Sequence, residues 1–551
     1  MKIKISSYLF IGFCLIINLS VFQLHAQDVT FSPLSKFYVK GSLGYGKGIN
    51  GQRIVNKDGN DNVTSGLSYY GNGIYGKIAG GYQLNNHIGF EIGFGYLSGF
   101  QNNLYPPYQN NFEKATGQMW QAIPSVVFSS SLGIITLYSR TGLILGMPEI
   151  DIDTKTHNNN QQNTNPVIED KYKLYNGLAT GIQSTIGFTI PLKNNNLNLF
   201  IEAAFNDISF LPQNESLNYY SQNGIDKLST LAVNGKEFIF KDNASTFPFG
   251  TSMDQPATLP QLKFDFSGLI ISAGVKLNVG NMNVPFIRDT IKKHLYIRAN
   301  AGYGFALNGD LAYDINDAGE AKTMMFSGSH GFSIGLGVGY MLNTNIGIDI
   351  GLNYIKGDSL KSNPNEYMPG LYMPGLHSSS DFQSSIYGNM YELNPSIIFT
   401  THIKKFKPYA RFGLLIGLGT VYSSINANIS DSAGGGSSGN YRSTWKYSGG
   451  VSFGYNSALG IAYPVNRKLE FYTEASFNTI YFTPIQGIRT EDSYNGIDKL
   501  NNDPVSDKSM IFRQNYSKSD NSDSSKPTIT SPVNFSFSAT VISIGIRKWL
   551  R

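Results

Sequence analysis

Ten isolated charges lie in otherwise apolar, glycine-rich stretches of this sequence, and they are the residues best placed to do chemistry. They form two sets of five in which the order of signs repeats while the residue types change. The sets are Lys40, Glu91, Arg140, Glu202 and Lys276, then Arg298, Asp349, Arg411, Glu474 and Arg547. Three cations and two anions in one dry interior are expected to pair, because an unpaired buried charge is costly.

Such charge sets have two possible uses. They could line an ion path or gate, or they could form a salt-bridge network that fills a closed core. Because each set holds both signs, the pattern favours the structural network.

Other chemistry has little support in the sequence. None of the seven histidines has zinc-ligand spacing or lies near a serine in a nucleophile-elbow context. His330 with Ser329 and Asp310 could form a lipid-modifying site, but an ordinary loop histidine is the favoured interpretation. Cys14 is the only cysteine, which excludes disulfides. We expect no enzyme, no metal ion and no cofactor.

The elements that position these charges come from one unit that occurs twice. FYVKGSLGYG (37–46) matches LYIRANAGYG (295–304), an offset of 258, and later blocks match at offsets of 271 to 272. An insertion between 356 and 389 explains the change. The sequence predicts a first barrel unit at 27–279, a periplasmic linker at 280–293 and a second unit at 294–551.

Each unit has the alternation of β-strands. Phe90, Ile92, Phe94 and Tyr96 share one face of a strand, while Glu91 and glycines share the other. The same alternation puts all ten charges on the face away from the apolar side chains. Eight strands are predicted in the first unit, near 37–46, 75–84, 88–97, 119–128, 135–145, 177–190, 197–206 and 268–278. The polar segments 47–74, 98–118, 147–175 and 207–266 are expected to be long outward loops.

Composition favours a membrane barrel over a soluble one. The chain has 59 Gly, 34 Tyr, 35 Phe and only 15% charged residues. Lipid-facing residues at alternate positions give a weak hydropathy signal of this kind. A soluble barrel would fill its interior with the large apolar residues, whereas here the second face carries glycine and lone charges. The net charge of +5 is too small to indicate nucleic acid.

The N-terminus is typical of a secretory signal. Lys2 and Lys4 precede an apolar stretch at 9–21, and Ala26 offers a small residue for cleavage. We therefore expect a signal peptide at 1–26 and export to the outer membrane of a Gram-negative-type envelope.

Each half resembles the OmpA/OmpX-like family of small outer-membrane β-barrels. The resemblance rests on GSLGYG and ANAGYG in the first strands, GFEIGFGY and GIDIGLNY in the third, YSRTG and YARFG, and the final VKL and IRK strands. It covers about 37–279 and 294–550. It implies eight-stranded barrels, outer-membrane lipid around them and the barrel-assembly machinery as a partner, and it says little about activity. Trp549 is followed by Leu550 and Arg551, so the usual terminal aromatic signal is off-register.

Two architectures follow for an all-β, antiparallel chain of this kind. Two tandem eight-stranded barrels are favoured, because each half has its own charge set and the connection 280–293 is long. The alternative is one sixteen-stranded barrel with an aqueous channel. Two separate barrels predict a structural or interaction protein that contacts a surface partner through its loops. A single sixteen-stranded barrel predicts a porin-like diffusion channel. The motif NGIDKL at 223–228 and 495–500 offers Asp226 and Asp498 as candidate loop contacts.

Overall fold

The computed structural model describes residues 36–49, 51–57, 63–108, 111–132, 134–157, 167–192, 196–245, 252–279, 294–315, 320–362, 382–429 and 439–550. The expected signal peptide at 1–26 and linker at 280–293 lie outside the described residues. No helix in the described part of the chain is both long and apolar enough to cross a membrane.

The first half of the chain folds into a closed antiparallel barrel. Its eight strands are β1 (Phe37–Gly48), β4 (Gly73–Gln83), β5 (Ile88–Gly99), β7 (Asn111–Leu132), β8 (Ile135–His157), β10 (Ala179–Pro191), β11 (Leu197–Phe210) and β18 (Gly268–Val279). Each strand pairs with the next in this order, and β1 also pairs with β18, with Phe37 opposite Val279. Each of these eight strands thereby has both its neighbours within this half.

The second half repeats this barrel. Its strands are β19 (His294–Ala306), β22 (Gly331–Met341), β23 (Ile346–Gly357), β25 (Phe382–Thr400), β26 (Lys407–Ile429), β28 (Ser452–Pro464), β29 (Leu469–Phe482) and β36 (Ala539–Leu550). Closure is made by β19 and β36, with Leu295 opposite Leu550. The prediction of two eight-stranded barrels is confirmed. The sixteen-stranded alternative is wrong, because β1 and β19 already have both neighbours within their own halves.

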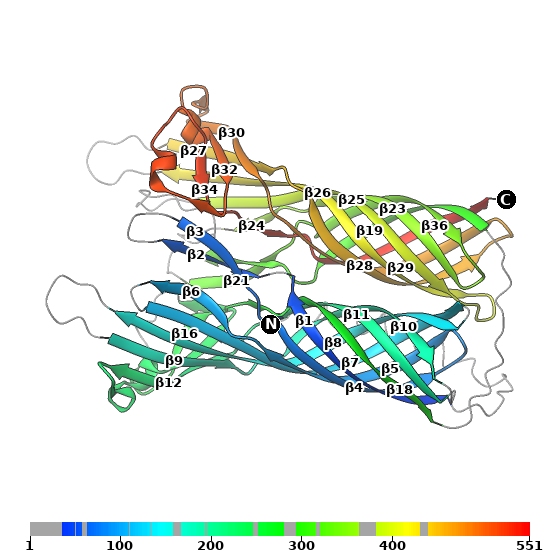
Figure 1. Cartoon of the computed structure of the whole chain (residues 1–551). Coiled ribbons are helices and arrows are strands. Elements are labelled where there is room, and N and C mark those ends of the chain that lie inside the picture. Colours follow the sequence, from blue (N-terminus) through cyan, green and yellow to red (C-terminus); the bar gives the residue numbers. More distant parts are fainter. Residues whose placement is uncertain are drawn as a thin grey trace, which may run out of the picture.

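The predicted loops contain more β-structure than expected. β7 and β8 run for 22 and 23 residues, so they continue beyond a barrel of the expected height and carry further strands. In the first half these are β9 (Val167–Tyr175), β12 (Asn214–Gln222), β14 (Glu237–Lys241) and β16 (Ala257–Pro260), and in the second β27 (Gly439–Ser448), β30 (Gln486–Tyr494), β32 (Ser509–Phe512) and β34 (Thr528–Thr530). We call these two extensions the outer sheets. They lie on the same side of the two barrels (Figure 1).

Shorter elements complete the outer end. They are β2 (Gln52–Lys57), β3 (Val63–Ser68), β6 (Asn102–Tyr108), β13 (Ile225–Asp226), β15 (Asn243–Ser245), β17 (Phe264–Asp265), β20 (Asp310–Ile315), β21 (Glu320–Phe326), β24 (Leu360–Ser362), β31 (Ile497–Asp498), β33 (Asn515–Tyr516) and β35 (Phe535–Ser536). Helical turns are limited to η2 (Leu228–Thr230), η3 (Val233–Gly235), α2 (Val505–Lys508) and η4 (Lys518–Asn521) among the described residues.

The two barrels lie side by side (Figure 1), and strands β7, β8 and β10 of the first contact β25, β26 and β28 of the second. The hydroxyl oxygens of Thr141 on β8 and Ser457 on β28 are 2.7 Å apart. The ring of Phe205 on β11 packs against Phe412 at 5.8 Å and Tyr455 at 4.7 Å between centroids. At the outer end, β15 of the first half pairs with β21 of the second.

Candidate functional site

The lumen of the first barrel holds a compact group of charges. Arg140 contacts both carboxylates: its Nη1 bonds to Glu91, and its Nη2 lies 3.1 Å from Oε1 of Glu202. Lys40 Nζ lies 3.4 Å from an oxygen of each carboxylate. Lys77, which the sequence analysis missed, adds contacts of 3.4 Å to Glu91 and 3.8 Å to Glu202. All five side chains are buried, so this is a dry ionic layer across the barrel.

The second lumen has the same layer built with arginine. Nη2 of Arg298 lies 2.7 Å from Oδ1 of Asp349, and its Nε adds a second hydrogen bond to the same carboxylate. Arg411 bridges Asp349, at 3.3 Å, to Glu474. Two arginines that can each donate several hydrogen bonds replace three cations of the first barrel.

The fifth residue of each predicted set lies beside the ionic layer. Lys276 Nζ lies 4.1 Å above the ring of Tyr38, a cation–π contact. Arg547 pairs with Glu470 at 3.4 Å, an acid that the sequence analysis did not single out. Glu470 also pairs with Lys407, the first residue of β26. Four of the five residues in each predicted set therefore meet in one layer.

Tyrosines that face glycines complete the layer, and they too were missed. The hydroxyl of Tyr38 donates to Glu91 at 3.1 Å, and that of Tyr296 donates to Asp349 at 2.9 Å. Each tyrosine is directly opposite a glycine of the next strand, Gly81 or Gly339 in these cases. A Cβ on either glycine would overlap the ring. Tyr138 and Tyr409 repeat the arrangement over Gly187 and Gly460, with Glu202 and Glu474 as acceptors. A tyrosine that faces a glycine on the neighbouring predicted strand is the sequence signal that could have identified these tyrosines.

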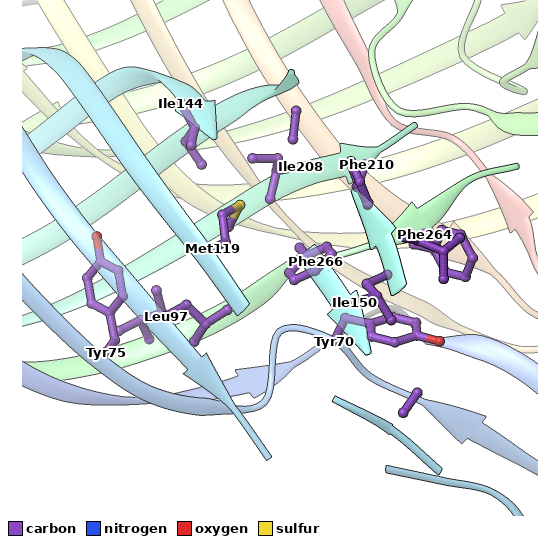
Figure 2. Close-up of a cluster of buried hydrophobic side chains, with 14 of the residues drawn as sticks. Tyr70, Tyr75, Leu97, Met119, Ile144, Ile150, Ile208, Phe210, Phe264 and Phe266 are labelled. Carbon is purple, nitrogen blue, oxygen red and sulfur yellow. The ribbon is translucent and has the colours of Figure 1, made fainter. Parts of the chain in front are cut away.

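An apolar plug closes each barrel on the side of the outer sheets. In the first barrel it consists of Tyr70, Met119, Ile144, Ile208, Phe210, Phe264 and Phe266, all buried (Figure 2). Phe266 enters from the chain segment just before β18, and its ring meets Phe210 at 6.3 Å. Phe537 and Phe482 repeat this contact in the second barrel at 6.2 Å. An ionic layer and an apolar plug therefore fill each lumen in series.

The ionic layers have no group arranged for catalysis. Each carboxylate accepts from a tyrosine and pairs with one or more cations, so it is committed to structural contacts. Among the described residues, no group of three or more His, Cys, Asp or Glu side chains could hold a metal ion. The arrangement can do one thing well, which is to fill a narrow barrel with neutralised charge.

The histidine considered for lipid chemistry lies apart from its proposed partners. The His330 ring packs against Tyr303 at 5.6 Å between centroids. The Asp310 carboxylate accepts a hydrogen bond from the backbone of Ser536 at 2.7 Å. No hydrogen bond within the described part of the chain joins the His330 ring to Ser329 or Asp310, which agrees with the favoured interpretation of His330 as an ordinary loop histidine.

A second polar cluster, which the sequence did not reveal, lies between the barrels near their outer end. The Asp207 carboxylate accepts from Asn308 and from Thr479, both at 2.6 Å. Lys263 donates to the carbonyl of Gly309 at 2.6 Å. These contacts join β11 of the first barrel to residues of the second, so we call the cluster the barrel clasp.

The repeated NGIDKL motif has a local structural role in both halves. Asn223 and Gly224 have positive φ angles of 54° and 78°, as a type I′ hairpin turn requires. Asp226 accepts from the backbone N–H of Leu228 at 2.9 Å. Asp498 makes the equivalent bond to Leu500 at 2.8 Å. Both aspartates stabilise a turn, which supports the simpler interpretation of the repeat.

No protein-family model and no curated protein matches this chain. Solved structures do match. Neisserial surface protein A is 14% identical, with 46% of this chain and 96% of that chain covered and a TM-score of 0.19. A major outer membrane protein from Thermus thermophilus is 12% identical, with 47% and 99% covered and a TM-score of 0.23. The outer membrane protease OmpT from Escherichia coli is 11% identical, with 95% and 99% covered and a TM-score of 0.18.

Two of these matched proteins are named as outer-membrane proteins. The strand pairing of the present chain makes it an all-β antiparallel barrel protein. Within that class it is a chain with two barrels, each of which closes with eight strands.

Proposed function

We propose that this chain is an exported outer-membrane protein of the OmpA/OmpX-like type with a structural or interaction role. In this proposal two filled barrels anchor the outer sheets, which contact a partner outside the cell. The observation that carries it is the filling of both lumens, each by an ionic layer and an apolar plug in series.

The outer faces of the barrels support the membrane setting. Large apolar side chains alternate with the buried lumen residues and are exposed, for example Leu43 at 71%, Leu336 at 65% and Ile544 at 70%. A belt of this kind around a barrel would be costly in water and is the expected surface against lipid. The lumen, by contrast, holds the charges.

The filled lumens argue against a diffusion pore. An eight-stranded barrel is just wide enough for its own side chains, whereas open channels need more strands. Here the space that remains is taken by ion pairs that would have to break, and by aromatic rings that would have to leave. The porin-like alternative required a sixteen-stranded barrel, which the pairing of β1 with β18 contradicts.

The outer sheets are suited to recognition because they are extensions of rigid strands. β8 continues to His157 and pairs there with β9, which pairs in turn with β12. Binding residues are commonly carried on connections that a rigid scaffold positions. The hairpin tips expose Ile225 at 61% and Ile497 at 68%, and nothing in the turn geometry requires an apolar residue there.

Surface labelling tests the membrane topology on which the proposal depends. The sequence has no cysteine after Cys14, so single cysteines can be placed in a cysteine-free mature chain. Ile225→Cys and Ile497→Cys should react with a membrane-impermeant maleimide on intact cells. Asn86→Cys and Lys405→Cys, in the short turns at the other end, should react only after the outer membrane is permeabilised. The reverse pattern would contradict the proposal.

Deletion of an outer hairpin tests the interaction role. Removing 218–236 in one variant and 489–508 in another should leave barrel folding intact, as judged by heat-modifiable gel migration, because Ser216 pairs with Glu237 and Ile488 with Ser509 at the bases of these hairpins. Each deletion should reduce binding of the host cells to a partner surface or to each other. Unchanged binding in a variant lacking both hairpins would argue against these hairpins as the contact.

A further inference from the structure

A shallow groove crosses the outer surface of the second barrel. It has a volume of about 520 Å³ and an almost wholly apolar lining. Its walls are two rows of outward side chains that follow the cross-strand register. One row is Ile546, Ala299, Leu336, Leu352 and Leu393, and the other is Leu469, Lys548, Ile297, Val338 and Ile350.

The floor of the groove is backbone. Arg298, Gly337 and Gly351 lie between the two rows, and the Arg298 side chain turns into the lumen to pair with Asp349. Because side chains alternate along a strand, the residues on either side of this floor point outward. Ala299 is the smallest member of its row, so its short side chain leaves space between larger neighbours.

The groove rises from the short-turn rim into the apolar belt. Lys548 is two residues from the inner end of β36, whereas Leu393 is seven residues from that of β25. A row that crosses five antiparallel strands is about 19 Å long. With strands tilted by about 40°, the row rises by about 12 Å, which is most of a hydrocarbon leaflet of about 15 Å.

The rim end of the groove is basic. Lys548 is exposed and lines the groove. The short turn before β29 carries Arg467 and Lys468, both exposed, and the Lys468 carbonyl accepts from the Trp549 N–H at 2.8 Å. This bond holds the turn beside β36. Three exposed cations therefore lie at this rim, and no acid of β29 or β36 faces outward to neutralise them.

The first barrel does not repeat this combination. Leu277 stands at the position of Lys548, and Gly80 stands at that of Val338, at offsets of 271 and 258. The cation is therefore absent, and one wall is interrupted, since nothing lies within 4 Å of a Cβ placed on Gly80. Both barrels nevertheless close with eight strands, so the fold itself requires neither feature.

We propose that this groove binds an anionic phospholipid, with an acyl chain along the groove and the phosphate at Lys548, Arg467 and Lys468. The inference rests on the membrane setting proposed above and adds a ligand class to it. The apolar lining and its depth suit an acyl chain. The three cations suit a headgroup with net negative charge, because basic residues at a membrane surface attract anionic lipid.

The position of the cations selects the source of the lipid. They lie at the short-turn end of the barrel, which faces the periplasm in the proposed topology. The periplasmic leaflet of an outer membrane consists of phospholipid, whereas lipopolysaccharide occupies the other leaflet.

Native mass spectrometry of the mature full-length chain tests the site. The chain is refolded in detergent and checked by heat-modifiable migration. It is then mixed with equal amounts of phosphatidylglycerol and phosphatidylethanolamine that carry the same acyl chains. We expect the wild type to retain phosphatidylglycerol about fivefold more than phosphatidylethanolamine, as one basic residue at a membrane surface would give.

Three variants separate the headgroup from the acyl chain. Lys548→Leu, which introduces the first-barrel residue type, should reduce the preference for phosphatidylglycerol. Lys405→Leu is the matched control, because Lys405 is exposed in the short turn before β26, three strands from β36. It should keep the wild-type preference. Ala299→Phe fills the groove without a change in charge and should lower the retention of both lipids.

Equal retention of the two lipids by folded wild-type protein would overturn the proposal, as would an unchanged preference in Lys548→Leu. Lipid A, offered in place of phosphatidylethanolamine, should be retained less than phosphatidylglycerol. Stronger retention of lipid A would also overturn the assignment. A chain that does not fold in detergent would contradict the membrane setting itself, and the site with it.

Discussion

At the scale of single residues, each lumen carboxylate is neutralised from several sides. Glu202 accepts from the Tyr138 hydroxyl at 2.8 Å and from Arg140 at 3.1 Å, with Lys40 at 3.4 Å. Such a site makes the outcome of a substitution depend on which partner is removed. Removing a cation that is paired with carboxylates leaves buried anions without a partner. Removing a cation that contacts only an aromatic ring leaves no unpaired charge.

Arg140→Met should therefore destabilise the first barrel strongly. It leaves Glu91 and Glu202 with two lysines and with lost hydrogen bonds, and breaking a buried pair costs about 3 to 5 kcal/mol. Lys276→Met is the matched control, because Lys276 contacts the ring of Tyr38 and should cost about 1 kcal/mol or less. Urea unfolding in lipid vesicles measures both. Equal losses would show that Arg140 contributes no more than a ring contact.

Stability should respond to pH through Asp310, which lies near Lys263 of the barrel clasp and accepts a hydrogen bond from the Ser536 N–H. Burial raises the pKa of Asp310 from its ordinary value of 3.8 to about 6, although the nearby Lys263 ammonium opposes the rise. A raised carboxyl pKa means that the folded state binds the proton more tightly than the unfolded state. Stability should therefore fall as pH rises from about 4 to about 6, and then level off.

Asp310→Asn isolates this contribution. It keeps an acceptor for the Ser536 N–H but cannot ionise, so its unfolding free energy should change less between these pH values than that of the wild type. The measurement is urea unfolding at a series of pH values. A wild-type profile that rises across this range, or an identical slope in the variant, would contradict the assignment.

At the scale of elements, the ladder between the two longest strands of each barrel is interrupted beside a matched proline and glycine. In β7 and β8 the ladder skips Ile123 and Pro124, because proline has no N–H to donate. Gly142 pairs with Ser125 at the edge of this gap, and a Cβ there would be 2.7 Å from the carbonyl oxygen of Pro124. Pro395 and Gly413 repeat the feature in the second barrel.

Gly142→Ala should destabilise the first barrel by about 1 to 3 kcal/mol, since the added methyl group forces backbone to move. Gly80→Ala is the control within the same barrel, because nothing lies within 4 Å of its Cβ position. It should be neutral or slightly stabilising. Urea unfolding of the two variants side by side decides the matter, and equal effects would refute the steric argument.

The barrel strands were predictable from sequence, and the outer sheets were not. The period-two alternation from Phe90 to Tyr96 predicted β5, and the internal repeat predicted β23, its equivalent in the second barrel. The prediction stopped each strand at membrane length. β8 instead continues through Ile150, which packs in the apolar plug. Ile150 and Ile152 alternate with Asp151 and Asp153, so the period-two pattern continues into a segment that was predicted to be a loop.

At the scale of the whole molecule, the contact between barrels could not be predicted from one chain. Alternation identifies the outer face of a strand without saying whether lipid or protein covers it. Thr141 and Ser457 face outward and bind each other, and Asp207 faces outward into the barrel clasp. Their polarity on an outward face was the available signal.

The equivalent faces that meet suggest how the molecule holds together. β8 of the first barrel touches β28 of the second, and the Phe205 ring reaches β26 and β28. The strand contacts are reciprocal, since β8 meets β28 and their counterparts β26 and β10 also meet. Reciprocal contacts of this kind are typical of a symmetric dimer, here within one chain. The lumens lie to either side of this contact and do not merge.

Conductance across a planar bilayer tests the central claim, that both barrels are filled, most directly. The mature chain would be inserted after heat-modifiable migration has shown that it is folded. Filled barrels predict a silent bilayer at moderate voltage. Large, stable, anion-favouring steps would contradict the account and would mean that the ionic layers line an open path.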